Sequence, residues 1–232
     1  MTHSDPALVE TMPPSAGPAD LAPGRFVDSD HPAIIAYARA HAGTGEARDQ
    51  AVSLYYAVRD EIRYDPYRVD LGEAGLKASR CLALGYGFCI TKAALLAAVL
   101  RAAGIPARLG FADVKNHLTS ARLRATMRSD IFVFHGYTEM FLDRRWVKAT
   151  PAFNRSLCDK AGILPLEFDG RADSVFHPFD ASGRRHMEYV RARGVFTDVP
   201  RAEILAAFAE AYPASAVWNQ TGGDFETEAS AG

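Results

Sequence analysis

The chain has 232 residues, of which 48% are hydrophobic and 23% are charged, as in average soluble globular proteins. This composition excludes collagen-like, coiled-coil and wholly disordered chains, and the length suits one ordinary domain. The 26 Lys and Arg residues nearly balance the 28 Asp and Glu residues, which gives a formal net charge of -2. We therefore expect neither a nucleic-acid partner nor binding to an anionic membrane.

No apolar run approaches the roughly 20 residues that cross a bilayer, and residues 1–10 lack the pattern of a signal peptide. The sequence therefore predicts a cytoplasmic protein. Its three cysteines, Cys81, Cys89 and Cys158, form no C-x-x-C pair, which argues against a disulfide framework and a thiolate zinc site. We expect reduced thiols, with structural roles for Cys81 and Cys158, and neither a metal nor an organic cofactor.

The two ends differ from the middle of the chain. Residues 1–25 contain five prolines and no apolar periodicity, so they are predicted to be a flexible arm. Residues 213–232 are polar and glycine-containing, and we expect a weakly ordered tail there. A single domain is predicted over residues 26–212.

Helical periodicity dominates the first half of this domain. It predicts amphipathic helices over residues 32–41 and 45–63, followed by a loop at 64–77. The segment 89–104 is apolar around its whole circumference and is followed by Pro106, so it is predicted to be a helix buried at the centre of the domain.

Strand patterns dominate the second half. A short strand is expected at 107–112, then a polar connection, then a β-hairpin from Ile131 that turns at Asp143 and Arg144. Further expectations are a turn that contains Cys158, a strand at 166–170, a second hairpin around 181–183 and a helix over 200–212. Helices followed by strands predict an α+β domain.

Cys89 is the candidate nucleophile because it opens the central helix directly after Tyr86-Gly87-Phe88. The unpaired backbone N–H groups and the dipole of a helix N-terminus favour an anion. Such a position is expected to lower the pKa of a thiol and to supply donors for an oxyanion on a substrate carbonyl.

His135 is the candidate base, on the first strand of the hairpin. A turn at Asp143 and Arg144 pairs residues whose numbers sum to 287, which sets Thr150 diagonal to His135 on one face. A turn shifted to Arg144 and Arg145 would instead set Asn154 opposite His135. Either side chain has an oxygen that could orient the imidazole.

Two blocks carry a family resemblance: GYGFCITKAALLAAVLRAAGIPAR, followed by FHGYTEMFLDRRWVKATP. Together they resemble the transglutaminase-like superfamily of cysteine enzymes over roughly residues 55 to 155. Matching residues are Gly87, Cys89, Arg101, Ala102, Gly104, Ile105, Pro106 and Arg108, then His135, Tyr137, Glu139, Trp146, Val147 and Pro151. The resemblance implies a papain-like core in which N-terminal helices and a central buried helix pack against an antiparallel sheet.

The resemblance also implies a Cys89–His135 enzyme that hydrolyses or transamidates a peptide, a protein or a small amide or thioester. One position departs from the family pattern, because Thr150 stands where the family has its catalytic aspartate. Asn154 is chemically the better candidate for orienting the imidazole, because an amide oxygen has this role in papain-like proteases. The alternative is a degenerate member that binds or scaffolds without catalysis.

Overall fold

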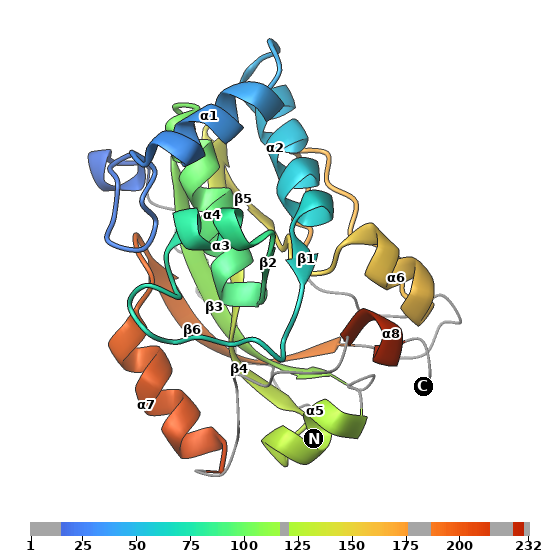
Figure 1. The fold of residues 1–232 in the computed structure, drawn as a ribbon. Helices are drawn as coiled ribbons and strands as arrows, with labels where there is room; N and C mark the ends of the chain where they lie inside the picture. The colour runs from blue at the N-terminus through green and yellow to red at the C-terminus, as the bar shows by residue number, and fades with distance from the viewer. Residues whose placement is uncertain (1–14, 117–120, 176–186, 214–224, 230–232) are drawn as a thin grey trace, which may run out of the picture.

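The computed structural model describes residues 15–116, 121–175, 187–213 and 225–229. An antiparallel four-stranded sheet lies at its centre, and the helices of the N-terminal half gather on one face of that sheet (Figure 1). The predicted α+β fold, with helices packed against an antiparallel sheet, is confirmed.

Two helices begin the N-terminal half, α1 over Pro32–His41 and α2 over Ala47–Glu61. Both confirm the helical periodicity of the sequence. Helix α2 ends before the predicted residue 63 because Ile62 adopts an extended backbone conformation. That change of direction leads directly into the short strand β1, Arg63–Tyr64.

The central helix is α4, Cys89–Ala102, and every residue from Cys89 to Arg101 is buried. It contacts α1, α2, the sheet, and α3, which spans Ala78–Leu84. Many of its side chains are alanine, which allows neighbouring backbones to approach closely. The prediction of a helix buried on all sides is therefore confirmed.

Four strands form the main sheet in the order β5-β4-β3-β6, with antiparallel neighbours. Strand β3 continues to Asn116, beyond the predicted 107–112, because it pairs with β4 as far as Lys115 and with β6 as far as Asn116. The strands are β3 Ala107–Asn116, β4 Ile131–Leu142, β5 Arg145–Ala149 and β6 Met187–Phe196.

The β4–β5 hairpin turns at Asp143 and Arg144, as predicted. Both turn residues have positive φ, 49° and 65°, as the two central residues of a type I′ hairpin turn require. Leu142 pairs with Arg145 and Thr138 with Ala149, so the register has the predicted sum of 287. The shifted turn at Arg144 and Arg145 is excluded.

The remaining helices surround these layers (Figure 1). Helix α6 is absent from the sequence-based expectations, and it places Cys158 in a buried helical position rather than in a turn. Asn154 at its N-cap and Gly162 after its end were the available signals. The helices are α5 Ala121–Met127, α6 Arg155–Ala161, α7 Arg201–Ala211 and α8 Phe225–Ala229.

The predicted strand at 166–170 is wrong, because this segment bonds to helix α2 instead of to a strand. The carbonyl of Leu166 accepts a hydrogen bond from Tyr55 at 2.8 Å, and Tyr56 both donates to the carbonyl of Phe168 and accepts from its N–H. The first arm of the predicted second hairpin, residues 174–180, lies outside the described residues from 176 onward, and Ser174 forms an isolated bridge with Ala149. Its second arm is β6, which pairs with β3.

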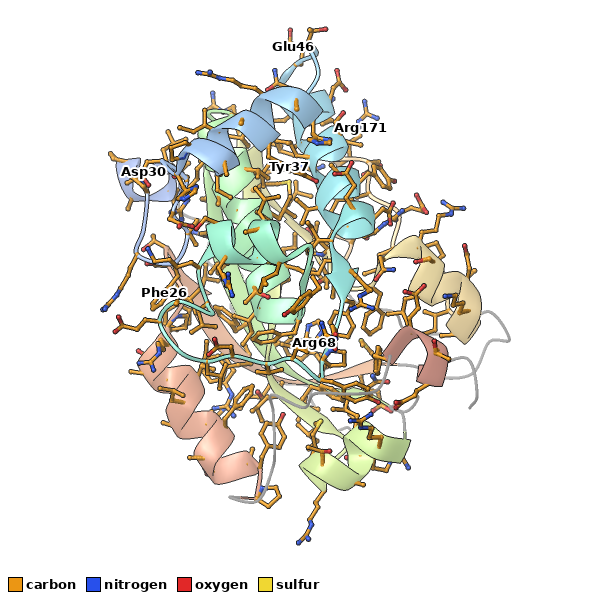
Figure 2. All side chains as sticks on the ribbon, viewed as in Figure 1. Phe26, Asp30, Tyr37, Glu46, Arg68 and Arg171 are labelled. Atoms are coloured by element: carbon orange, nitrogen blue, oxygen red, sulfur yellow. The ribbon has the colours of Figure 1, made fainter. Side chains whose placement is uncertain are left out.

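A carboxylate joins the N-terminal segment to the end of the sheet. Asp198 accepts backbone hydrogen bonds from Arg25, Phe26 and Val27 at 2.7 to 3.2 Å, and another from Val199. Phe26, labelled in Figure 2, is itself buried in the core. These contacts lie after β6 and do not include β4.

Candidate functional site

The start of α4 is held by a pair of two-residue parallel strands. Strand β2, Tyr86–Gly87, pairs with β1 so that Tyr64 lies beside Gly87. The Asp65 N–H donates to the Gly87 carbonyl at 2.8 Å. Phe88 then forms the N-cap in an extended conformation, and Cys89 is the first helical residue. The sequence prediction that Cys89 opens the helix is confirmed.

Strand β4 approaches the start of α4 at Gly136, the residue after His135. A Cβ atom at position 136 would lie 3.2 Å from Cα of Ile90 and 3.3 Å from the Cys89 carbonyl oxygen. Such distances are tighter than most Cβ contacts, so glycine favours this close approach. The fold therefore brings the backbone beside His135 directly against Cys89.

The expected lowering of the Cys89 pKa is wrong for the described structure. Burial raises the pKa of the thiol to about 11, and hydrogen bonds from the backbone amides of Gly136, Ile90 and Cys89 itself only partly oppose this effect. The side chain is almost fully enclosed, with Cys89 9% exposed. Desolvation disfavours the thiolate more than the helix N-terminus favours it.

His135 lies on β4 at the wall of a small cavity that is too narrow to hold a water molecule. Its ring is only 2% exposed, and neither Nδ1 nor Nε2 has a hydrogen-bond partner within the described part of the chain. Burial lowers the pKa of the imidazole to about 4, so the ring is neutral at pH 7. The lining residues are His135, Thr150, Ala152, Phe153, Val175 and Met187.

Thr150 and His135 therefore share one cavity, as the hairpin register predicts. The Thr150 hydroxyl donates to the Val175 carbonyl at 2.7 Å, and its N–H donates to Ser174 at 2.9 Å. No hydrogen bond joins Thr150 to His135 in the described structure. The hydroxyl retains lone pairs that could accept a proton from an imidazole N–H.

The side chain of Asn154 forms hydrogen bonds with residues other than His135. Its Oδ1 accepts the Tyr64 N–H at 2.9 Å, and its Nδ2 donates to the Ser156 hydroxyl at 2.7 Å. The side chain thus ties the start of α6 to β1, and it is absent from the cavity lining. The structure brings Thr150 to His135 and does not bring Asn154 there.

Two tyrosines near the thiol escaped the sequence reasoning, Tyr64 on β1 and Tyr212 after α7. Both are buried, and burial raises the pKa of each, with the charge of a Cys89 thiolate as a further cause. The Tyr64 ring also packs edge-to-face against the rings of Phe153 and Phe225, with ring centroids 4.8 and 5.6 Å away. No local sequence pattern marks either residue, because the chain separates them widely from Cys89.

Lys92 is a third residue that the sequence patterns did not indicate, and it lies one helical turn after Cys89 and is fully buried. Its Nζ donates to the carbonyls of Arg59 and Ile62 at the end of α2. Burial lowers the pKa of the amine to about 7. The contacts fix the point where α2 gives way to β1, and thus the strand that carries Tyr64.

Several of the matching motif residues have structural roles. Arg101 donates to the carbonyls of Ala22 and Ala107, and Arg108 donates to Glu139 at 2.7 Å. The Arg108 guanidinium carbon also lies 3.8 Å from the Trp146 ring centroid. These contacts hold the helix end and the strands together, away from the Cys89–His135 region.

Within the described residues, no three His, Cys, Asp or Glu side chains group closely enough to bind a metal ion. The helices there are too short or too polar to cross a membrane. The three cysteines are free thiols, and Cys89 is the most exposed of them.

Comparisons with known proteins assign the chain to a family. The family model of the transglutaminase-like superfamily matches residues 35–151, half of the chain. A crystal structure of a "putative cysteine protease" from Cytophaga hutchinsonii is similar, with 16% sequence identity and a TM-score of 0.44. The match covers 76% of this chain and 52% of that one, so this chain spans about half the length of that protein. No curated protein matches the sequence. The chain belongs to the transglutaminase-like superfamily.

Proposed function

We propose that the protein is a cysteine-dependent acyl-transfer enzyme that hydrolyses or transamidates an amide or thioester. Cys89 would be the nucleophile and His135 the base and acid, in one domain over residues 26–212. The observation that supports this best is the imidazole of His135, which is buried in a cavity with both ring nitrogens unpartnered among the described residues.

This observation favours a functional histidine over a structural one. Buried polar groups in folded proteins are nearly always hydrogen-bonded. A buried donor or acceptor without a partner costs roughly 1–3 kcal/mol. A histidine kept for stability would be expected to have a partner, whereas a catalytic base needs a nitrogen free to take a proton.

In the proposed reaction, His135 removes the Cys89 proton and the sulfur attacks the substrate carbonyl carbon. The carbonyl oxygen becomes an oxyanion, to which the backbone N–H groups around Cys89 could donate hydrogen bonds. The imidazolium then gives its proton to the leaving amine or thiol as the bond to carbon breaks. An incoming water or amine loses a proton to His135, attacks the thioester and releases the Cys89 thiol.

The substrate class proposed is a peptide, a protein or a small amide or thioester, and the proposed location is the cytoplasm. Cys89 and His135 are both enclosed in the described structure, so a substrate must displace covering side chains. Phe153 and Met187 line the cavity beside His135 and are the candidates for that movement.

A catalytically inactive binding module is the second candidate function. Two observations favour it. Thr150 stands where the family has an aspartate, and its hydroxyl proton is directed at Val175 rather than at His135. Burial also raises the pKa of the Cys89 thiol.

Alkylation with iodoacetamide at neutral pH separates the two functions. If Cys89 is paired functionally with His135, peptide mapping should find Cys89 labelled before the more deeply buried Cys81 and Cys158. Replacing His135 with Ala should slow that labelling by about 10²-fold, since a positioned base contributes on this scale. Earlier labelling of another cysteine, or an unchanged rate without the imidazole, would support the inactive module.

Restoring a carboxylate at position 150 should increase reactivity. An anion within a few ångströms stabilises an imidazolium by about one to three pKa units, so Thr150→Asp should speed the alkylation of Cys89 by about tenfold or more at neutral pH. Thr150→Asn is the matched uncharged control. Equal alkylation rates in the two variants would show that the absence of a carboxylate at position 150 does not limit the reactivity of the Cys89 thiol.

A further inference from the structure

Strand β4 is irregular immediately before His135. Ala112 of β3 pairs with His135, but Val114 pairs with Phe132, so the register shifts by one residue between them. Phe134 lies in the shifted segment with φ of 53°. Positive φ is rare for an aromatic residue, and such strain is retained only where the surroundings enforce it.

Two side chains satisfy the backbone groups that this bulge removes from the ladder. The Phe134 N–H donates to Oδ1 of Asp113 at 3.1 Å, and the Val133 N–H donates to the hydroxyl of Tyr212 at 2.9 Å. Tyr212 in turn donates to the Ile131 carbonyl at 3.1 Å. The Val133 N–H is thus bound by Tyr212, the residue after α7, and the next N–H, that of Phe134, is bound by Asp113 of β3.

Arg193 of β6 holds Asp113 in this position. Its Nε lies 2.8 and 3.0 Å from the two carboxylate oxygens, and its Nη2 lies 2.8 Å from Oδ2. The guanidinium carbon also lies 5.0 Å from the ring centroid of Phe134. Asp113 is 5% exposed, so its carboxylate is shielded from water, and the contacts with the guanidinium constrain its geometry.

The bulge determines where His135 and Gly136 lie. His135 forms no polar contact of its own within the described residues, so its direction depends on packing and on the backbone that carries it. Gly136, one residue further, contacts Cys89 and Ile90. Any relaxation at Phe134 would therefore move the imidazole relative to the thiol.

We propose that Asp113 is a positioning residue, which together with Arg193 and Tyr212 fixes the bulge of β4 and thereby directs His135 toward Cys89. The proposal rests on the proposed function and extends it. Asp113 touches neither the sulfur nor the imidazole; it acts through the backbone N–H of Phe134. Misplacement of a reacting group by about 1 Å can cost about 10²-fold in rate.

The test compares Asp113→Ala with Asp113→Asn. Both remove the same charge, but the amide oxygen of Asn can still accept the Phe134 N–H. We expect iodoacetamide to alkylate Cys89 about tenfold or more slowly in the Ala variant than in the Asn variant at neutral pH. The pH profile of the Ala variant should follow the thiol alone, as in His135→Ala, whereas the Asn variant, which loses only the ion pair with Arg193, should lie between that profile and the wild-type profile.

Asp198→Asn is the control, because Asp198 also accepts several backbone N–H groups but contacts none in β4. It should keep the wild-type rate and profile. Equal rates for the two Asp113 variants would overturn the positioning role. If His135→Ala itself leaves the rate unchanged, the proposed function fails instead.

If Asp113→Ala does not fold, Arg193→Gln gives the decisive measurement. This variant keeps the carboxylate that accepts the Phe134 N–H but loses the ion pair that holds it. We expect a rate between those of the wild type and His135→Ala, with a profile shifted toward that of the thiol alone. A wild-type rate and profile would overturn the proposal.

Discussion

Replacing Cys89 with serine should lower turnover by at least about 10³-fold while leaving the fold intact, because a hydroxyl is a far weaker nucleophile at neutral pH. p-Nitrophenyl acetate is a suitable probe, since a thiolate would take its acetyl group and release p-nitrophenolate. Mass spectrometry should find the acetyl group on Cys89 in the wild type and none in the variant. The similar size of the two side chains should keep the melting temperature close to that of the wild type.

Cys158→Ser provides the matched control, because Cys158 is equally free but fully buried in α6. It should react with the probe at the wild-type rate as long as it remains folded. Near-normal turnover of the Cys89 variant would exclude nucleophilic attack by this sulfur. Loss of turnover in the Cys158 variant alone, with its fold retained, would move the chemistry to another part of the molecule.

The parts of the fold that follow from local patterns could be predicted from the sequence. The apolar residues around the whole circumference of α4 predict a helix that is buried on every side. The hairpin register follows from its turn, because two residues that tolerate positive φ fix which side chains face each other. That register is what places Thr150 and His135 on one cavity wall.

Contacts between distant segments could not be predicted in the same way. Leu166 and Phe168 alternate like strand residues, yet hydrogen bonds from Tyr55 and Tyr56 of α2 satisfy their backbone groups. The bulge at Phe134 depends on Asp113 and Tyr212, which a local pattern in β4 cannot reveal. Backbone pairing of this kind depends on tertiary contacts, which override local propensity.

The same limit applies to the chemistry of the site. The sequence places Cys89 at a helix start, and that placement alone favours a thiolate. Burial depends on what packs over the helix end, and here it reverses the expected direction of the pKa shift. Likewise, Asn154 has suitable chemistry for orienting an imidazole, but its amide is bound to Tyr64 and Ser156.

His135 should make the protein less stable in acid. Its pKa is about 4 in the folded chain, against an ordinary value of 6.5, because burial disfavours the imidazolium. The unfolded chain therefore binds the proton more readily, and the stabilisation is complete above pH 6.5 and lost as the pH falls toward 4. At about 1.4 kcal/mol per pKa unit, the free energy of unfolding should fall by roughly 3 kcal/mol across this window.

Urea unfolding of the wild type and of His135→Gln at several pH values measures this contribution. Glutamine does not titrate, so the gap between the two stability curves should change by roughly 3 kcal/mol between neutral pH and pH 4, the folded-state value for His135. His41→Gln is the control, since this half-exposed histidine lies at the surface beside Glu61. Parallel curves for the wild type and His135→Gln would mean that the imidazole is solvated in solution. The cavity beside His135 would then be open without substrate, and the movement of Phe153 and Met187 would not be needed for entry.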